Sequence, residues 1–141
     1  MTIDWGHSMP TLIDTNILVY AAGADGDRTR QQIAIKTLGD YRADGALAVQ
    51  VLAEFANVLM RKRRPLETIR SDISVLEKTW QIVASDASTV SLALVGVEEH
   101  QMSFWDAMLW ATAKQHRLTT ILSEDGPTGS TVGDVLYLSP F

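Results

Sequence analysis

The sequence predicts an α/β fold built on a mainly parallel sheet that helices cover on both faces. Short apolar runs of strand length alternate with longer stretches of helical periodicity from residue 11 onwards. A chain that adds parallel strands must cross over between them, usually through a helix, so this alternation favours a parallel sheet. With 141 residues and 46% hydrophobic content, the chain is long enough to bury one substantial core.

The expected elements follow one another without an internal repeat or a linker. In order they are strand 11–14, helix 15–22, helix 27–41, strand 46–49, helix 50–64, helix 66–80, strand 81–85, helix 88–100, helix 103–116, strand 119–122 and strand 135–138. The loop 125–133 separates the last two strands.

The elements of the first half have clear boundary signals. The apolar run TLID is a strand, and Thr15 and Asn16 turn the chain into the first helix. Gly45 breaks the periodic stretch 27–41 and precedes the buried strand ALAV. The next helix is stopped by Pro65, because the residue before a proline disfavours the helical region.

The elements of the second half are identified in the same way. Residues 66–80 form an amphipathic helix, with apolar side chains at helical spacing at Ile69, Ile73, Leu76 and Trp80. QIVAS, TTIL and VLYL have the length and composition of strands, and Ser103 is the expected cap of the last helix. The tryptophans Trp80, Trp105 and Trp110 have core-like spacing and are expected to pack rather than to stack on bases.

The N-terminus and the composition suggest a compartment. Residues 1–9 are expected to be a disordered leader or an expression remnant, followed by one domain over 10–141. The start lacks a basic segment and a continuous apolar region, so it does not resemble a signal peptide. No apolar stretch reaches the roughly 18 residues needed to span a bilayer, so no membrane partner is expected. Because the chain has no cysteine, a reducing cytoplasm is the plain interpretation.

Four acidic residues stand within or beside apolar stretches: Asp14, Glu54, Asp106 and Asp125. An isolated carboxylate removed from water costs several kcal/mol unless it is protonated, paired or bound to a cation. Four such placements in one small domain indicate a common partner, and the natural one is a divalent metal. The net charge of −5 argues against nucleic acid, but setting these four aside leaves 13 acidic against 12 basic residues.

The positions of the acids support a shared site. Asp14 and Asp125 follow strands, which places both at the carboxyl edge of the sheet, where ligands of such folds bind. Glu54 lies on the shoulder of the apolar face of its helix. Asp106 lies beneath the apolar residues of the last helix.

Each acid also has a structural alternative. Asp14 is compatible with a helix cap, and Asp125 with an ordinary turn in which Glu124 is the functional acid. Glu54 is compatible with an edge residue that reaches water or pairs with Arg61 or Lys62.

Asp106 completes a Ser103-x-x-Asp106 capping box, in which it would bond back to the cap's N–H. The basic run Arg61, Lys62, Arg63 and Arg64 is either a solvated helix end or a phosphate contact.

A carboxylate-only site selects Mg²⁺ or Mn²⁺ over zinc, because these ions prefer oxygen ligands and the three histidines are scattered. Mg²⁺ typically takes one or two carboxylates together with water and phosphate oxygens. The site therefore suits phosphodiester hydrolysis by a metal-activated water.

The segments DTNILVYA, LAEFANVL, SFWDAMLWATA and LSED, in this order, resemble the PIN domain family and within it the VapC-like toxins of type II toxin–antitoxin systems. The resemblance covers about residues 10–141. It implies a three-layer α/β/α fold with a mainly parallel central sheet and a Mg²⁺- or Mn²⁺-dependent endoribonuclease. Asp14, Glu54, Asp106 and Asp125 would be the catalytic and metal-binding acids.

The resemblance further implies that Thr15, Asn16 and Ser123 are supporting polar groups and that Arg61, Lys62, Arg63 and Arg64 are candidates for RNA contact. RNA is the implied substrate, a cognate antitoxin protein the implied partner, and a homodimer the implied assembly. One departure is Gly126, since the family often has an apolar residue after the last acid.

Two alternatives remain open at this point. The first is a PIN-fold binding module that holds RNA or a partner without cutting. The second is a haloacid dehalogenase-type phosphatase with Asp14 as nucleophile, although that family has a second Asp where this chain has Asn16.

Overall fold

A six-stranded sheet forms the centre of the protein, with the strand order β3-β2-β1-β4-β6-β5. The computed structural model describes residues 9–141, so the expected leader lies outside the described residues except for Met9. The strands are β1 (Thr11–Ile13), β2 (Gly45–Ala48), β3 (Gln81–Val83), β4 (Thr120–Leu122), β5 (Thr131–Val132) and β6 (Val135–Leu138). All neighbouring strands pair in parallel except β5, which is antiparallel to β6.

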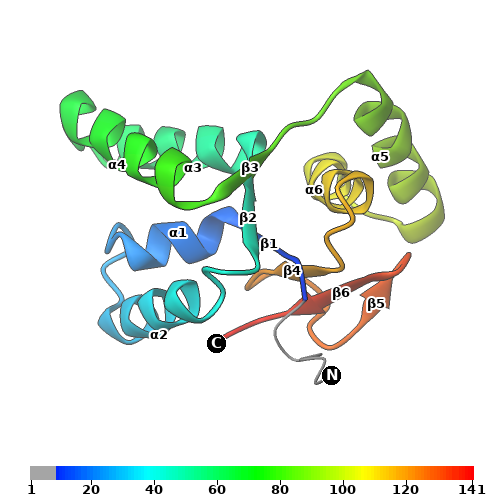
Figure 1. The fold of residues 1–141 in the computed structure, drawn as a ribbon, viewed down its shortest axis with the longest axis horizontal. Coiled ribbons are helices and arrows are strands. Elements are labelled where there is room, and N and C mark those ends of the chain that lie inside the picture. Colours follow the sequence, from blue (N-terminus) through cyan, green and yellow to red (C-terminus); the bar gives the residue numbers. More distant parts are fainter. Residues whose placement is uncertain (1–8) are drawn as a thin grey trace, which may run out of the picture.

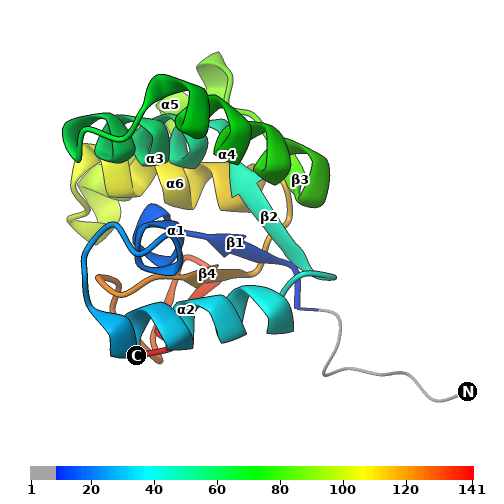
Figure 2. The same ribbon diagram turned by 90° about the vertical axis from the view of Figure 1, so that its left-hand side faces the viewer.

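Helices cover both faces of the sheet. They are α1 (Thr15–Ala21), α2 (Arg28–Asp40), α3 (Val49–Arg61), α4 (Leu66–Thr79), α5 (Ala87–His100) and α6 (Phe104–Gln115). In Figure 1, α1 to α4 lie on one side of the strands and α5 and α6 on the other. Figure 2 looks onto the first layer, where α1 lies between α2 and α3. The predicted three-layer α/β/α architecture is confirmed.

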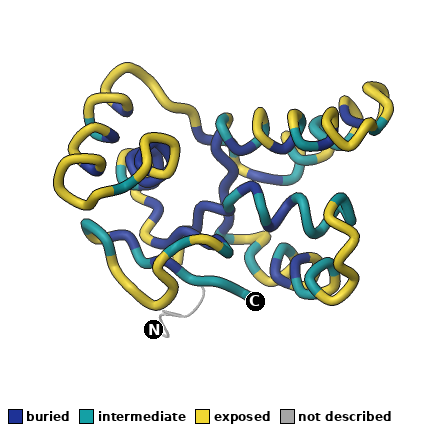
Figure 3. Tube along the Cα trace, turned by 180° about the vertical axis from the view of Figure 1, so that it is seen from behind, coloured by how far each residue is buried: buried dark blue, intermediate teal, exposed yellow. Residues whose placement is uncertain are grey.

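The core lies along the central strands. Leu12 and Ile13 of β1 are fully buried, and the residues of β4 are nearly so. Figure 3 shows the buried residues gathered on the strands and on the inner turns of the helices. Among the described residues, no helix is both long and apolar enough to cross a membrane.

The strand order reverses at β1, because the chain leaves it for β2 on one side and later returns to β4 on the other. The carboxyl ends of β1 and β4 are hydrogen-bonded, since the backbone N–H of Asp14 donates to the carbonyl of Leu122 at 2.9 Å. In open α/β sheets a ligand crevice forms at such a reversal, outside the carboxyl ends of the strands. This edge is therefore where a site is expected.

The helix expected over 50–64 ends three residues early, at Arg61. Arg63 has a left-handed backbone with φ of 60°, and the N–H of Arg64 donates to the carbonyl of Leu59 at 3.1 Å. This closure satisfies the free carbonyls at the end of α3, and Pro65 then becomes the cap of α4.

The loop 125–133 contains a strand that the sequence pattern did not predict. β5 pairs with β6 through a two-residue turn at Gly133 and Asp134, whose φ values are 48° and 71°. A two-residue hairpin turn whose backbone twist matches that of the flanking strands needs a positive φ at both of its residues. Gly and Asp tolerate a positive φ better than most residues, which explains why they occupy this turn.

The expectation that all three tryptophans pack in the core is wrong for one of them. Trp80 and Trp110 are buried, whereas Trp105 is 63% exposed. Trp105 and Trp110 are five residues apart on α6, so at about 100° per residue their side chains project from different sides of the helix.

Candidate active site

The four acids line one pocket of about 360 Å³ at the carboxyl edge of the sheet. Asp14 follows β1, Glu54 comes from α3, Asp106 from the first turn of α6, and Asp125 from the loop after β4. Thr15 and Asn16 also line the pocket, and none of the described residues that line it is basic. The structure therefore brings together the four carboxylates that the sequence pattern proposed, from four separate segments.

Asp14 is the only one of the four that is partly buried. It caps α1, because its Oδ1 accepts from the N–H of Thr15 at 2.7 Å, while its Oδ2 accepts from the Ser123 hydroxyl at 2.7 Å. Burial raises the pKa of Asp14 above its ordinary value despite these two bonds, and the negative charges of Glu54 and Asp106 raise it further. Asp14 therefore caps α1 and lines the acidic pocket at the same time.

The raised pKa of Asp14 predicts a pH-dependent effect on stability. The folded state binds the Asp14 proton more tightly than the unfolded chain, so this group lowers the free energy of unfolding as pH rises through the raised pKa. We expect Asp14→Asn to be more stable than the unchanged protein at pH 7 without divalent ions, because Asn also caps helices well. Urea unfolding as a function of pH measures the difference.

The advantage of the Asn variant should shrink as pH falls and disappear below about 3.8, the ordinary pKa, where Asp14 is protonated in both states. An Asn variant that is less stable at neutral pH would show that the carboxylate stabilises the fold.

Glu54 lies on the side of α3 that faces the pocket, but it is exposed rather than buried. Its Oε2 accepts from the Thr15 hydroxyl at 3.1 Å and its Oε1 from the Gln50 amide at 2.9 Å. No ion pair with Arg61 or Lys62 is present among the described residues. The desolvation argument applied to all four acids is thus wrong for Glu54, and also for Asp106 and Asp125, because all three are exposed.

Asp106 is also exposed. Its backbone N–H donates to the Ser103 hydroxyl at 3.4 Å, which confirms Ser103 as the helix cap. Among the described residues, the Asp106 carboxylate makes no bond back to the N–H of Ser103, so the reciprocal capping box is absent. The carboxylate is left facing the pocket.

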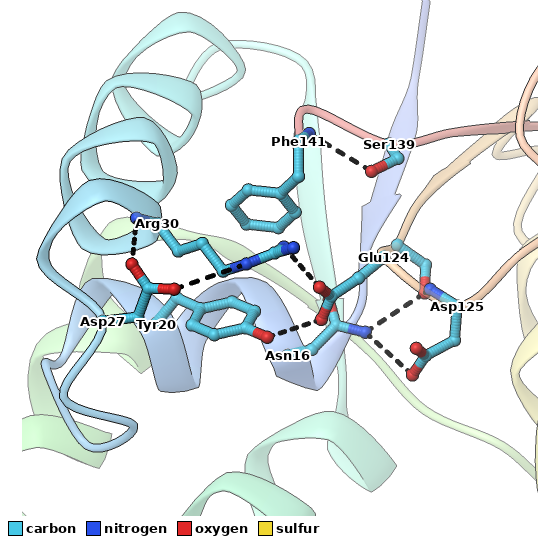
Figure 4. A network of polar contacts seen from close by, with 9 residues as sticks. Asn16, Tyr20, Asp27, Arg30, Glu124, Asp125, Ser139 and Phe141 are labelled. Carbon is cyan, nitrogen blue, oxygen red and sulfur yellow. Dashed lines mark hydrogen bonds and ion pairs between the residues drawn. The ribbon is translucent and has the colours of Figure 1, made fainter.

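The loop after β4 carries two acids, Glu124 and Asp125, which have different partners (Figure 4). Asn16 holds the loop: its Nδ2 donates to Asp125 Oδ2 at 3.4 Å, and its Oδ1 accepts from the N–H of Glu124 at 3.2 Å. The Glu124 carboxylate is bound by Arg30 and by the Tyr20 hydroxyl, the latter at 2.6 Å. Asp125 lines the pocket and Glu124 does not, so the geometry favours Asp125 as the fourth acid.

Arg30 and Tyr20 were not singled out by the sequence pattern. The Arg30 guanidinium lies over the rings of Tyr20 and Phe141, at 5.4 and 4.8 Å from their centroids. The bond to Glu124 raises the pKa of Tyr20 to about 12, so its hydroxyl remains a donor at neutral pH. Nothing in the sequence marks these partners, since Arg30 and Glu124 are 94 residues apart.

The pair Arg30–Glu124 is expected to stabilise the fold more than an ordinary surface ion pair. We expect a double-mutant cycle with Arg30→Gln and Glu124→Gln to give a coupling of about 1 to 2 kcal/mol, because the pair is partly shielded and charge-assisted. Chemical denaturation of the four proteins measures it.

The pair Lys36–Asp40 is the matched control, since both side chains are more than half exposed. Its coupling should be about 0.3 to 0.5 kcal/mol. Equal couplings for the two pairs would contradict the structural role given to Arg30.

The basic run at the end of α3 does not line the acidic pocket. Arg61, Lys62 and Arg63 are exposed, whereas Arg64 donates from Nη2 to the carbonyl of Ala22 at 2.9 Å. Arg64 therefore satisfies a carbonyl at the C-terminal end of α1, and the other three remain candidates for phosphate contact.

The donor set of the pocket fits Mg²⁺ or Mn²⁺, because it consists of carboxylate, hydroxyl and amide oxygens. In the described part of the chain, no three acidic or histidine side chains converge closely enough to form a ready-made metal cluster.

Tyr137 also lies beside the acids, and the sequence pattern did not single it out. In the sequence it is simply a buried position of a strand in which buried and partly exposed residues alternate. Its ring fills the space next to Gly126, where an added Cβ would overlap it. The departure at Gly126 noted in the sequence is thus explained by the ring of β6 that packs there.

Fold and site together define an α/β/α protein with a carboxylate-lined pocket at the reversal of its sheet. The model of the PIN domain matches residues 11–126, and the chain belongs to the PIN domain family. Comparison with curated proteins gives no match.

Three solved structures share the fold. A toxin–antitoxin complex from Klebsiella pneumoniae has a TM-score of 0.71 at 18% identity, over 93% of this chain and 98% of that chain. VapC20 from Mycobacterium tuberculosis, a sarcin–ricin loop cleaving toxin, has a TM-score of 0.67 at 21% identity, over 83% and 91%. VapBC2 from Rickettsia felis, bound to a DNA fragment from its promoter, has a TM-score of 0.67 at 15% identity, over 92% and 97%.

Proposed function

We propose that this protein is a Mg²⁺- or Mn²⁺-dependent endoribonuclease and the toxin of a toxin–antitoxin pair. The observation that carries the proposal is the gathering of Asp14, Glu54, Asp106 and Asp125 around one pocket. Membership of the PIN domain family and a fold shared with toxins, one of them named for cleaving the sarcin–ricin loop, give further support.

The four carboxylates line the space in which a metal would be held, with one or two of them as direct ligands; the metal would supply an activated water and neutralise charge on the phosphate. Ser123 and Thr15 keep Asp14 and Glu54 in place through their hydroxyls. Asn16 fixes the loop that carries Asp125. Mutual repulsion among carboxylates without a basic neighbour makes the pocket attractive to a divalent cation and unattractive to bare phosphate.

Removal of divalent ions tests the proposal. We expect a mixed pool of RNA to be cut internally with Mn²⁺ or Mg²⁺, to stay intact with excess EDTA, and to be cut again when Mn²⁺ is restored. Gel analysis of end-labelled RNA measures this. Cleavage that persists undiminished in EDTA would contradict a metal-dependent mechanism.

The alternative of a non-cleaving PIN-fold module has one observation in its favour, the lack of a ready-made metal cluster in the described residues. Saturable stabilisation by Mn²⁺ without cleavage of any RNA in the same pool would support that alternative. The phosphatase alternative loses its basis, because Asn16 at the position of the second acid is engaged in holding the loop.

The proposed partners are the RNA substrate, a cognate antitoxin protein and a second copy of the chain, in the cytoplasm. One of the structures that share the fold, that from Klebsiella pneumoniae, is described as a toxin–antitoxin complex. Co-purification with the product of a neighbouring reading frame, with loss of RNA cleavage in the complex, tests the antitoxin.

A further inference from the structure

A second pocket, of about 230 Å³, adjoins the acidic one. It shares Asp14, Asp106 and Asp125 with the acidic pocket and extends away from them. Its lining includes residues 100–103, from the end of α5 to the start of α6, and residues 126–127 of the loop after β4. A chain of RNA with a phosphate at the acids would therefore have this pocket directly beside that phosphate.

The lining of this second pocket is mixed, with an apolar part beside polar and acidic side chains. Its floor consists of side chains from α6, β4, β5 and β6, namely Leu109, Ile121, Val132 and Tyr137. Met102 and Pro127 add apolar surface, while the neutral polar groups of the same lining come from His100, Gln101, Ser103 and Ser123. An apolar slot with polar groups suits a flat, partly polar ring better than it suits a phosphate or a sugar.

Tyr137 gives the second pocket a hydroxyl group that a ligand can bind. It is only 6% exposed, but its hydroxyl keeps access to solvent and has no hydrogen-bond partner among the described residues. A tyrosine hydroxyl that has no protein partner and belongs to a residue of a pocket lining is available to a ligand. Burial, together with the negative charges of Asp106 and Asp14, raises the pKa of Tyr137, so the hydroxyl stays protonated at neutral pH.

The packing around the ring keeps it in place. An added Cβ at Gly126 would overlap the ring, so the absence of a side chain there lets Tyr137 occupy its position. A fixed ring with a free hydroxyl discriminates between ligands better than a mobile one, because less freedom is lost on binding.

We propose that this pocket binds an unpaired nucleobase next to the scissile phosphate, with the Tyr137 hydroxyl bonding to an edge of the base. The proposal rests on the proposed function and adds a subsite to it. Proteins that recognise single-stranded RNA hold splayed bases in this manner, against apolar or aromatic side chains and with hydrogen bonds to the base edges. Tyr137 is thus assigned as a residue that determines base preference.

The decisive variant is Tyr137→Phe, which removes only the hydroxyl. Binding of the four free nucleosides, which carry no phosphate for the acids to repel, is followed by NMR without metal ions. We expect one nucleoside to bind preferentially, and Tyr137→Phe to weaken it about tenfold, the usual effect of one lost hydrogen bond. In parallel, 5′-end mapping of a random RNA pool cut with Mn²⁺ should show a base bias beside the cut that Tyr137→Phe reduces while cleavage continues.

Tyr41→Phe is the matched control, since Tyr41 lies with Thr11 and Thr120 at the amino ends of the strands. It should leave both the nucleoside affinity and the base bias unchanged. Cleavage by Tyr137→Phe with an unaltered bias and affinity overturns the subsite and leaves the nuclease standing. Tyr137-dependent nucleoside binding without any RNA cleavage supports the subsite and overturns the nuclease.

Discussion

Asp106→Asn is expected to reduce Mn²⁺-dependent RNA cleavage by about 100-fold or more. A carboxylate that helps to hold a metal in a phosphodiesterase contributes several kcal/mol to the transition state, and each 1.4 kcal/mol is a factor of ten in rate. Because Asp106 is exposed and its carboxylate makes no capping bond at the start of α6 among the described residues, the fold should remain intact. Rates on end-labelled RNA and thermal unfolding of the same samples measure both effects.

Glu99→Gln is the matched control, because it also neutralises an exposed acid on a helix but lies outside both pockets. Its rate should equal that of the unchanged protein. Full activity of Asp106→Asn would remove Asp106 from the metal site and would leave the gathering of acids without the proposed purpose.

Trp110→Ala is expected to lower the free energy of unfolding by about 3 to 5 kcal/mol, the range found for large aromatic side chains in cores. Trp110 is 2% exposed, and its indole N–H donates to the carbonyl of Val132 at 2.9 Å. An added Cβ at Gly96 or at Gly133 would come within 3 Å of its ring, which shows how closely α5 and the β5–β6 turn pack on it. Urea unfolding measures the loss.

Trp105→Ala provides the comparison on the same helix. Trp105 is 63% exposed, so its truncation should cost less than about 0.5 kcal/mol. Similar losses for the two variants would mean that α6 packs on the sheet through a different face.

The fold was largely predictable because its elements are carried by local patterns. The apolar run Thr11–Ile13 and the periodicity of the helices each depend on neighbouring residues only, and these elements are all present. β5 is two residues long and is too short for any periodicity, so only its Gly133-Asp134 turn marked it. A turn of this kind is visible in a sequence once a hairpin is considered.

Four of the five acids that line the acidic pocket were predictable, whereas Asp25 was missed and the burial of the acids was not predictable. A helical pattern shows that Glu54 lies beside an apolar stripe, and it does lie on the side that faces the other acids. The pattern does not show that α3 borders an open pocket there instead of the core. Arg30, Tyr20 and Tyr137 reach the site through contacts between distant segments, which no local pattern contains.

The packing of Tyr137 against Gly126 has a consequence for the divergence of related sequences. Since one ring occupies the space that a side chain at 126 would need, the two positions are expected to change together. Relatives that carry an apolar side chain after the last acid should have a residue smaller than tyrosine at the position of Tyr137. Paired substitutions at positions 126 and 137 would then give otherwise similar pockets different shapes in different relatives.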